Sequence, residues 1–123
     1  MKQKKMKTRP FKNNETGFHK YAVIELANWT NGTMEQPFYI DDQIAFVPDV
    51  VTYKDGVIDR IYEVVHSHPI GGKKLGMMQY WSYRNQTELN VFEISSEFIL
   101  KHTEKPAHID SIEYYQINTN EPF

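Results

Sequence analysis

The chain contains no cysteine. This absence excludes disulfide bonds, a cysteine nucleophile and every metal site that uses thiolate ligands. The apolar runs are only a few residues long, so we expect no segment that spans a membrane. The first residues are basic, and no hydrophobic stretch of the kind found in secretory signals follows them, which predicts a cytoplasmic protein. A glycine-rich phosphate-binding loop is also missing, which argues against nucleoside triphosphate hydrolysis.

The composition is that of one folded domain. The 123 residues are 40% hydrophobic and 14% aromatic, which is too apolar for a disordered chain and enough for a real core. The net charge is only −2, but six of the 14 basic residues lie in the first twelve positions. We therefore expect a flexible basic arm over residues 1–14 and a single domain over residues 15–123, with an acidic surface.

Apolar spacing and turn residues predict the first elements. Phe18, Tyr21, Ala22, Leu26 and Trp29 follow helical spacing, which predicts a helix over residues 17–29. Two runs rich in β-branched and aromatic residues, DVVTY and VIDRIYEVVH, flank a Lys-Asp-Gly turn. This pattern is typical of a β-hairpin.

The second half of the chain repeats the alternation of helix and strand. We expect a helix over residues 73–85, a strand over 89–94, a short helix capped by the serines at 95 and 96, and a last strand over 111–117. The fold class is therefore predicted to be α/β (α+β), with a single mixed β-sheet flanked by helices.

The predicted hairpin brings two carboxylates together. If the turn is centred on Asp55-Gly56, Glu63 lies next to Asp49; one extra residue in the loop places the two directly opposite each other. Carboxylates this close repel each other unless a cation lies between them or one is protonated. Oxygen ligands of this kind suit Mg²⁺ or Mn²⁺. The alternative is that Asp49 caps the strand and Glu63 faces solvent.

Taken in order, several short motifs resemble the PD-(D/E)XK nuclease superfamily, in particular its RecB-type and competence-protein-like branch. Pro48-Asp49 resembles the "PD", Glu63-Val64-Val65 the "ExK", and Gln79 with Tyr83 the helix motif of that branch. The resemblance implies a restriction-endonuclease-like core and metal-assisted cleavage of nucleic acid, with DNA favoured over RNA and a homodimer as a common state.

The same resemblance assigns roles to individual residues. Asp49 and Glu63 would hold Mg²⁺ or Mn²⁺, and His19 and Glu25 stand where such nucleases keep metal ligands on their first helix. Gln79 and Tyr83 would position the phosphate or the nucleophile.

The chain departs from the family pattern at the lysine, because Val65 occupies its position and valine does no acid–base chemistry. His68 would take its place, or else Lys73 or Lys74, which lie at the start of the second predicted helix and could reach back to the site. Loss of the lysine leaves a second hypothesis open, a catalytically inactive nuclease-like module that binds or regulates a partner.

A third hypothesis comes from His66-Ser67-His68-Pro69, which resembles the signature of JAMM-type zinc peptidases, with Glu25 as the base. The expected downstream aspartate is missing, since Gln79 occupies its position, and two histidines alone leave zinc short of ligands. Glu93 is placed in a strand near the site, but we expect its side chain to face solvent.

Overall fold

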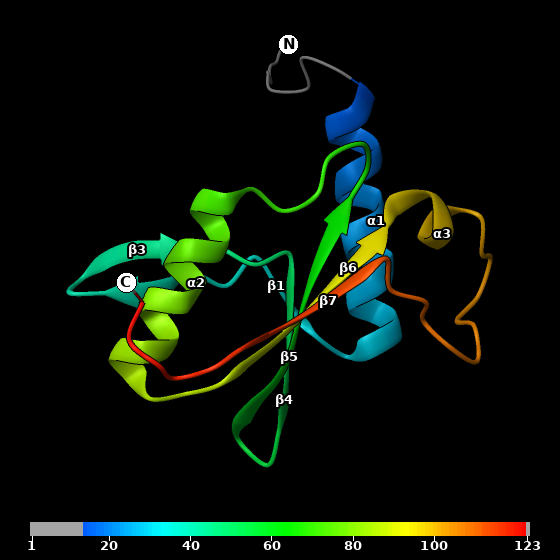
Figure 1. Cartoon of the computed structure of the whole chain (residues 1–123). Helices are drawn as coiled ribbons and strands as arrows, with labels where there is room; N and C mark the ends of the chain where they lie inside the picture. The colour runs from blue at the N-terminus through cyan, green and yellow to red at the C-terminus, as the bar shows by residue number, and fades with distance from the viewer. Residues whose placement is uncertain (1–13, 123) are drawn as a thin grey trace, which may run out of the picture.

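The computed structural model describes residues 14–122, and Figure 1 shows how their helices and strands are arranged. The predicted basic arm lies outside these residues apart from Asn14, which begins the first helix. The elements in chain order are α1 (Asn14–Thr30), β1 (Thr33–Met34), β2 (Phe38–Ile40), β3 (Gln43–Phe46), β4 (Val50–Lys54), β5 (Val57–Val65), α2 (Gly72–Asn85), β6 (Leu89–Ser95), α3 (Ser96–Leu100) and β7 (Glu113–Ile117).

Five strands form one mixed sheet in the order β1-β4-β5-β6-β7. Neighbouring strands run antiparallel except β5 and β6, which are parallel and are connected through α2. The prediction of a mixed sheet flanked by helices is therefore confirmed. Because α2 follows the carboxyl end of β5, the first turn of this helix lies at that end of the sheet (Figure 1).

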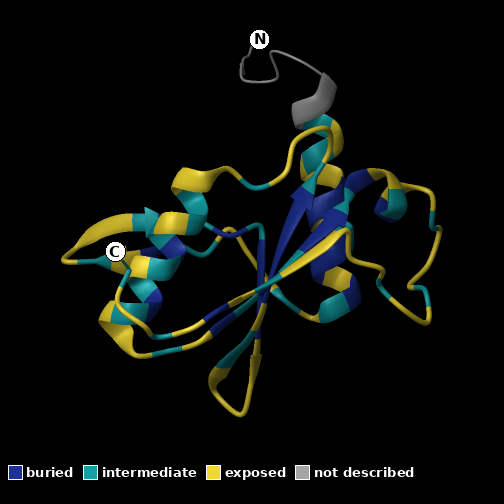
Figure 2. Cartoon of the chain, viewed as in Figure 1, coloured by how far each residue is buried: buried dark blue, intermediate teal, exposed yellow. Residues whose placement is uncertain are grey.

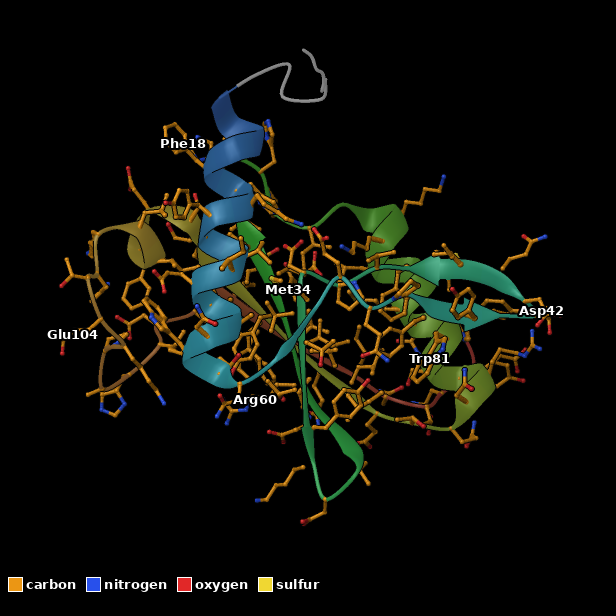
Figure 3. All side chains as sticks on the ribbon, turned by 180° about the vertical axis from the view of Figure 1, so that it is seen from behind. Phe18, Met34, Asp42, Arg60, Trp81 and Glu104 are labelled. Atoms are coloured by element: carbon orange, nitrogen blue, oxygen red, sulfur yellow. The ribbon has the colours of Figure 1, made fainter. Side chains whose placement is uncertain are left out.

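A separate two-stranded sheet, β2–β3, was not predicted. Its turn consists of Asp41 and Asp42, with φ of 50° and 67°, which are the left-handed angles that a two-residue hairpin turn requires. The small sheet packs against α2 through Phe38, whose ring centroid lies 4.9 Å from that of Trp81. Figure 3 shows Trp81 between this sheet and its helix.

The two faces of the large sheet carry different halves of the core. Side chains alternate between the faces along each strand. Val50, Tyr62, Val64 and Ile94 pack with α1 and α3, whereas Val51, Ile61 and Val91 belong to the cluster that contains Met78 of α2. Figure 2 shows that burial is concentrated where β5 and β6 pass α1, and that the turn of the β4–β5 hairpin is exposed. Within residues 14–122, every helix is too short or too polar to cross a bilayer.

Candidate active site

The register of the β4–β5 hairpin places Asp49 opposite Glu63. Near the turn Lys54 pairs with Val57, and after a bulge between Thr52 and Tyr53 the register shifts so that Val50 pairs with Tyr62. Continued one position beyond Val50, where β4 begins, this register sets Asp49 opposite Glu63. The hairpin thus has one of the two expected registers next to its turn and the other at the end where the carboxylates lie.

Three hydrogen bonds fix the carboxylate pair. The Asp49 amide donates to Oε2 of Glu63 at 3.1 Å, and the Val64 amide donates to Oδ2 of Asp49 at 2.7 Å. Nε2 of His19, on α1, lies 3.3 Å from Oδ1 of Asp49. His19 therefore reaches the residue before β4 from the neighbouring helix, and its predicted role as a metal ligand stays a prediction.

Lys74, in the first turn of α2, completes the cluster. Its ammonium donates to Oε1 of Glu63 at 2.6 Å and to the carbonyl of Val47 at 2.9 Å. The Glu63 side chain is 7% exposed and that of Lys74 is 30% exposed, so the ion pair is closed on the Glu63 side and open on the Lys74 side. Lys74 of α2 thus brings to Glu63 an ammonium group that Val65 of β5 cannot supply.

The electrostatics of the cluster favour a cation. Burial, and then the nearby Asp49 carboxylate, raise the pKa of Glu63 to about 7, and Lys74 opposes this shift. The hydrogen bond with Asp49 raises the pKa of His19, and burial partly offsets that effect. Two carboxylates in one buried site resist double ionisation, and a positive charge between them relieves the repulsion.

The donor set matches Mg²⁺ in kind. This ion is commonly bound by one or two carboxylates, with water and substrate phosphate as its other ligands. Asp49 and Glu63 are the residues that would hold it. Across residues 14–122 there is no cluster of three or more histidine or acidic side chains that could hold a metal ion. A site here would therefore depend on ligands from water and substrate.

Glu93 lies in a strand beside the site, as predicted, but the expectation that its side chain faces solvent is wrong. It pairs with Glu63 across the parallel strands β5 and β6, so the two side chains lie on the same face of the sheet. Glu93 is 2% exposed, not solvated, and its Oε2 accepts hydrogen bonds from the Ile70 amide at 2.7 Å and the Tyr115 hydroxyl at 3.2 Å. Glu93 is buried because the loop that contains Ile70 and the strand β7 cover it. The sequence around Glu93 reveals neither contact.

None of the hydrogen bonds described above to Asp49 or Glu63 comes from Glu25, His68 or Lys73. Glu25 follows His19 by six positions on α1 and is therefore rotated by about 120° from it around the helix axis. His68 is exposed in the loop after β5, and Lys73 is exposed beside Lys74. The helix contact with Glu63 belongs to Lys74 and not to Lys73.

Gln79 and Tyr83 lie further along α2. The Gln79 amide donates to the carbonyls of Asn118 and Asn120 at 2.8 and 2.9 Å, which ties the segment after β7 to the helix. Tyr83 is half-buried one turn later. In this arrangement the Gln79 side chain binds the segment after β7 and not the carboxylates.

The histidines of the zinc-peptidase hypothesis do not form a ligand set. Nδ1 of His66 lies 3.1 Å from Oγ of Ser96, and His68 is exposed. A catalytic zinc site needs three protein ligands, and the described part of the chain offers no such group.

No protein-family model, curated protein or solved structure matches this chain. The case for function therefore depends on the geometry of Asp49, Glu63 and Lys74.

Proposed function

We propose that this protein is a metal-dependent nuclease with a restriction-endonuclease-like core. The observation that carries the proposal is the Lys74 ammonium 2.6 Å from Glu63, within a pair of facing carboxylates at one end of the sheet. Asp49 and Glu63 would hold Mg²⁺ or Mn²⁺. The bound ion would polarise the phosphodiester and lower the pKa of a bound water.

Lys74 takes the role that Val65 cannot fill. An ammonium has three donors, and two of them are used by Val47 and Glu63. We assign the third to the attacking water or to a phosphate oxygen. His19 orients the Asp49 carboxylate through their 3.3 Å contact and adds positive charge when protonated.

The proposed substrate is nucleic acid, with DNA favoured over RNA, and the proposed location is the cytoplasm. The acidic body repels phosphates, so binding outside the site depends on the six cations in the first twelve residues. A homodimer is the assembly we propose to test.

One observation favours the second hypothesis, a nuclease-like module without catalysis. Each oxygen of the carboxylate pair already accepts or faces a hydrogen-bond partner within the protein, from Val64, His19, Lys74 and the Asp49 amide. A site that is satisfied without a metal ion can serve as a structural network alone.

Cleavage assays separate the two hypotheses. End-labelled single-stranded DNA, duplex DNA and RNA are incubated in Mg²⁺ or Mn²⁺ with the wild type, Asp49→Asn, Lys74→Met and Lys73→Met. We expect Asp49→Asn and Lys74→Met each to lower the cleavage rate by about 100-fold or more, as loss of a charge-stabilising group does. Lys73→Met is the matched control, since it removes the same charge from the neighbouring exposed residue. If the folded wild type cuts none of these substrates, the nuclease is rejected and the binding module is the remaining hypothesis.

A further inference from the structure

A cavity of about 470 Å³ lies beside the candidate active site. Its walls come from the loop after β5, from β6 and from β7, and are formed by residues 65–69, Glu93, Ile112, Glu113 and Tyr115. Glu93 connects the cavity to the site, because it pairs with Glu63 on the adjacent strand. Adjacent strands are about 4.8 Å apart. A ligand in this cavity would therefore lie next to anything held by Glu63.

The two oxygens of the Glu93 carboxylate differ in their hydrogen bonds. Both hydrogen bonds to this side chain, from Ile70 and Tyr115, end on Oε2. Among the contacts of residues 14–122, none reaches Oε1, although the residue is 2% exposed. Buried acceptors in folded proteins almost always have a partner. Glu93 lines the cavity, so Oε1 is the acceptor that we assign to an N–H or O–H group of a ligand.

The charge of the walls selects the kind of ligand. Glu93 and Glu113 are paired across β6 and β7 and both line the cavity, as do His66 and His68. A phosphate or another anion in the cavity would therefore meet two carboxylates. Pro69, Ile112 and Tyr115 supply apolar and aromatic surface. Flat aromatic ligands with hydrogen-bond donors on one edge suit such walls.

We propose that this cavity binds an unpaired nucleobase of the substrate, with guanine preferred. Guanine carries two adjacent donors, N1–H and the 2-amino group, on one edge. We assign one of them to Oε1 of Glu93 and the other to the Glu113 carboxylate, which lines the same cavity. Unpaired bases are commonly recognised by stacking on aromatic side chains and by hydrogen bonds along this edge. The inference rests on the proposed nuclease function, because the phosphodiester would lie at Asp49, Glu63 and Lys74 while the base fills the adjoining cavity.

The proposal restricts the substrate class. A base can enter the cavity only when it is not paired, so the cleaved strand is single-stranded or locally opened at the site. Cleavage is then expected to favour positions next to guanine. Glu113 and Glu93 become specificity-determining residues, distinct from those that act on the phosphodiester.

The test uses guanosine, which carries no phosphate, titrated into the full-length protein and followed by amide chemical shifts. We expect shifts at residues 66–68 and 112–115, and weaker or no shifts with uridine. Loss of a charge-assisted hydrogen bond should weaken guanosine binding about tenfold or more in Glu93→Gln. Glu113→Gln, at an exposed position, is the second variant if Glu93→Gln does not fold. Glu104→Gln is the control, because Glu104 lies on the outer edge of the loop after α3 (Figure 3).

Cleavage of strands with one randomised position is measured in parallel and separates the two claims. Cutting without base preference, together with no guanosine shifts in the cavity, overturns the nucleobase site and leaves the nuclease. Guanosine shifts at the cavity without any cutting support the site and reject the nuclease. Shifts that are unchanged in both glutamate variants also overturn the proposal.

Discussion

At the scale of residues, Glu63 dominates the electrostatics of the site. Its side chain is 7% exposed and faces the Asp49 carboxylate, and the Lys74 ammonium compensates its negative charge. Its pKa of about 7 means that the folded protein holds a proton there which the unfolded chain, with an ordinary glutamate pKa of 4.5, releases. The raised pKa gives stability that is complete below pH 4.5 and is lost as the pH rises through about 7.

We predict that this titration is visible in metal-free protein. Between about pH 5 and pH 8, the free energy of unfolding of the wild type should fall by up to about 3 kcal/mol more than that of Glu63→Gln. Urea denaturation in EDTA measures both proteins, and His19 titrates in each. A wild-type and a variant curve that stay parallel across this range would show that Glu63 does not titrate in the folded protein.

How far single residues can be predicted depends on how local their environment is. The proximity of Asp49 and Glu63 follows from counting residues back from the turn. The bulge between Thr52 and Tyr53 changes this count by one. The choice between Lys73 and Lys74 depends on the path of the loop before α2, and neighbouring helical residues differ by about 100° in direction. Burial of Glu93 is decided by Tyr115 and Ile70, which are distant in sequence or in a loop, so the local pattern indicated the wrong environment.

At the scale of elements, the sequence predicted the helices and the central strands well and the short strands poorly. The α2 helix begins one residue earlier than expected, and the Ser95 side chain caps α3 by accepting from the Glu97 and Phe98 amides. Strand β1 has only two residues, and β2–β3 turns through two aspartates without glycine. Such elements form because tertiary contacts hold them, which local propensity does not reveal.

The connection between α1 and β1 depends on a glycine that has no room for a side chain. A Cβ at Gly32 would lie 2.4 Å from Cγ1 of the buried Val50 and 3.1 Å from the Val51 carbonyl. We predict that Gly32→Ala destabilises the protein by about 1–3 kcal/mol through this overpacking. Gly76→Ala is the matched comparison, because Gly76 lies within α2 with nothing nearby and alanine there should stabilise by about 0.5–1 kcal/mol. Equal effects at both positions in urea denaturation would refute the steric argument.

At the scale of the whole molecule, charge is divided between the first twelve residues and the remainder. Six cations precede a body that holds all 16 acidic side chains. If the chain binds single-stranded nucleic acid, replacing the six cations by glutamine should reduce the slope of log affinity against log salt by up to about 4. Lys54→Gln, at the turn end of the β4–β5 hairpin, should leave the slope nearly unchanged. If the slope is unaltered in the variant that lacks all six cations, the basic segment does not contribute to binding.

The central claim is that Asp49 and Glu63 form a cation site, and metal-dependent thermal unfolding tests it most directly. A ligand present at about one hundred times its Kd stabilises the folded state by about 3 kcal/mol. We predict that Mg²⁺ or Mn²⁺ raises the Tm of the wild type and of Glu104→Gln by several degrees, and that this rise disappears in Glu63→Gln. A wild-type Tm that does not respond to either metal, or an equal rise in Glu63→Gln, would contradict the account.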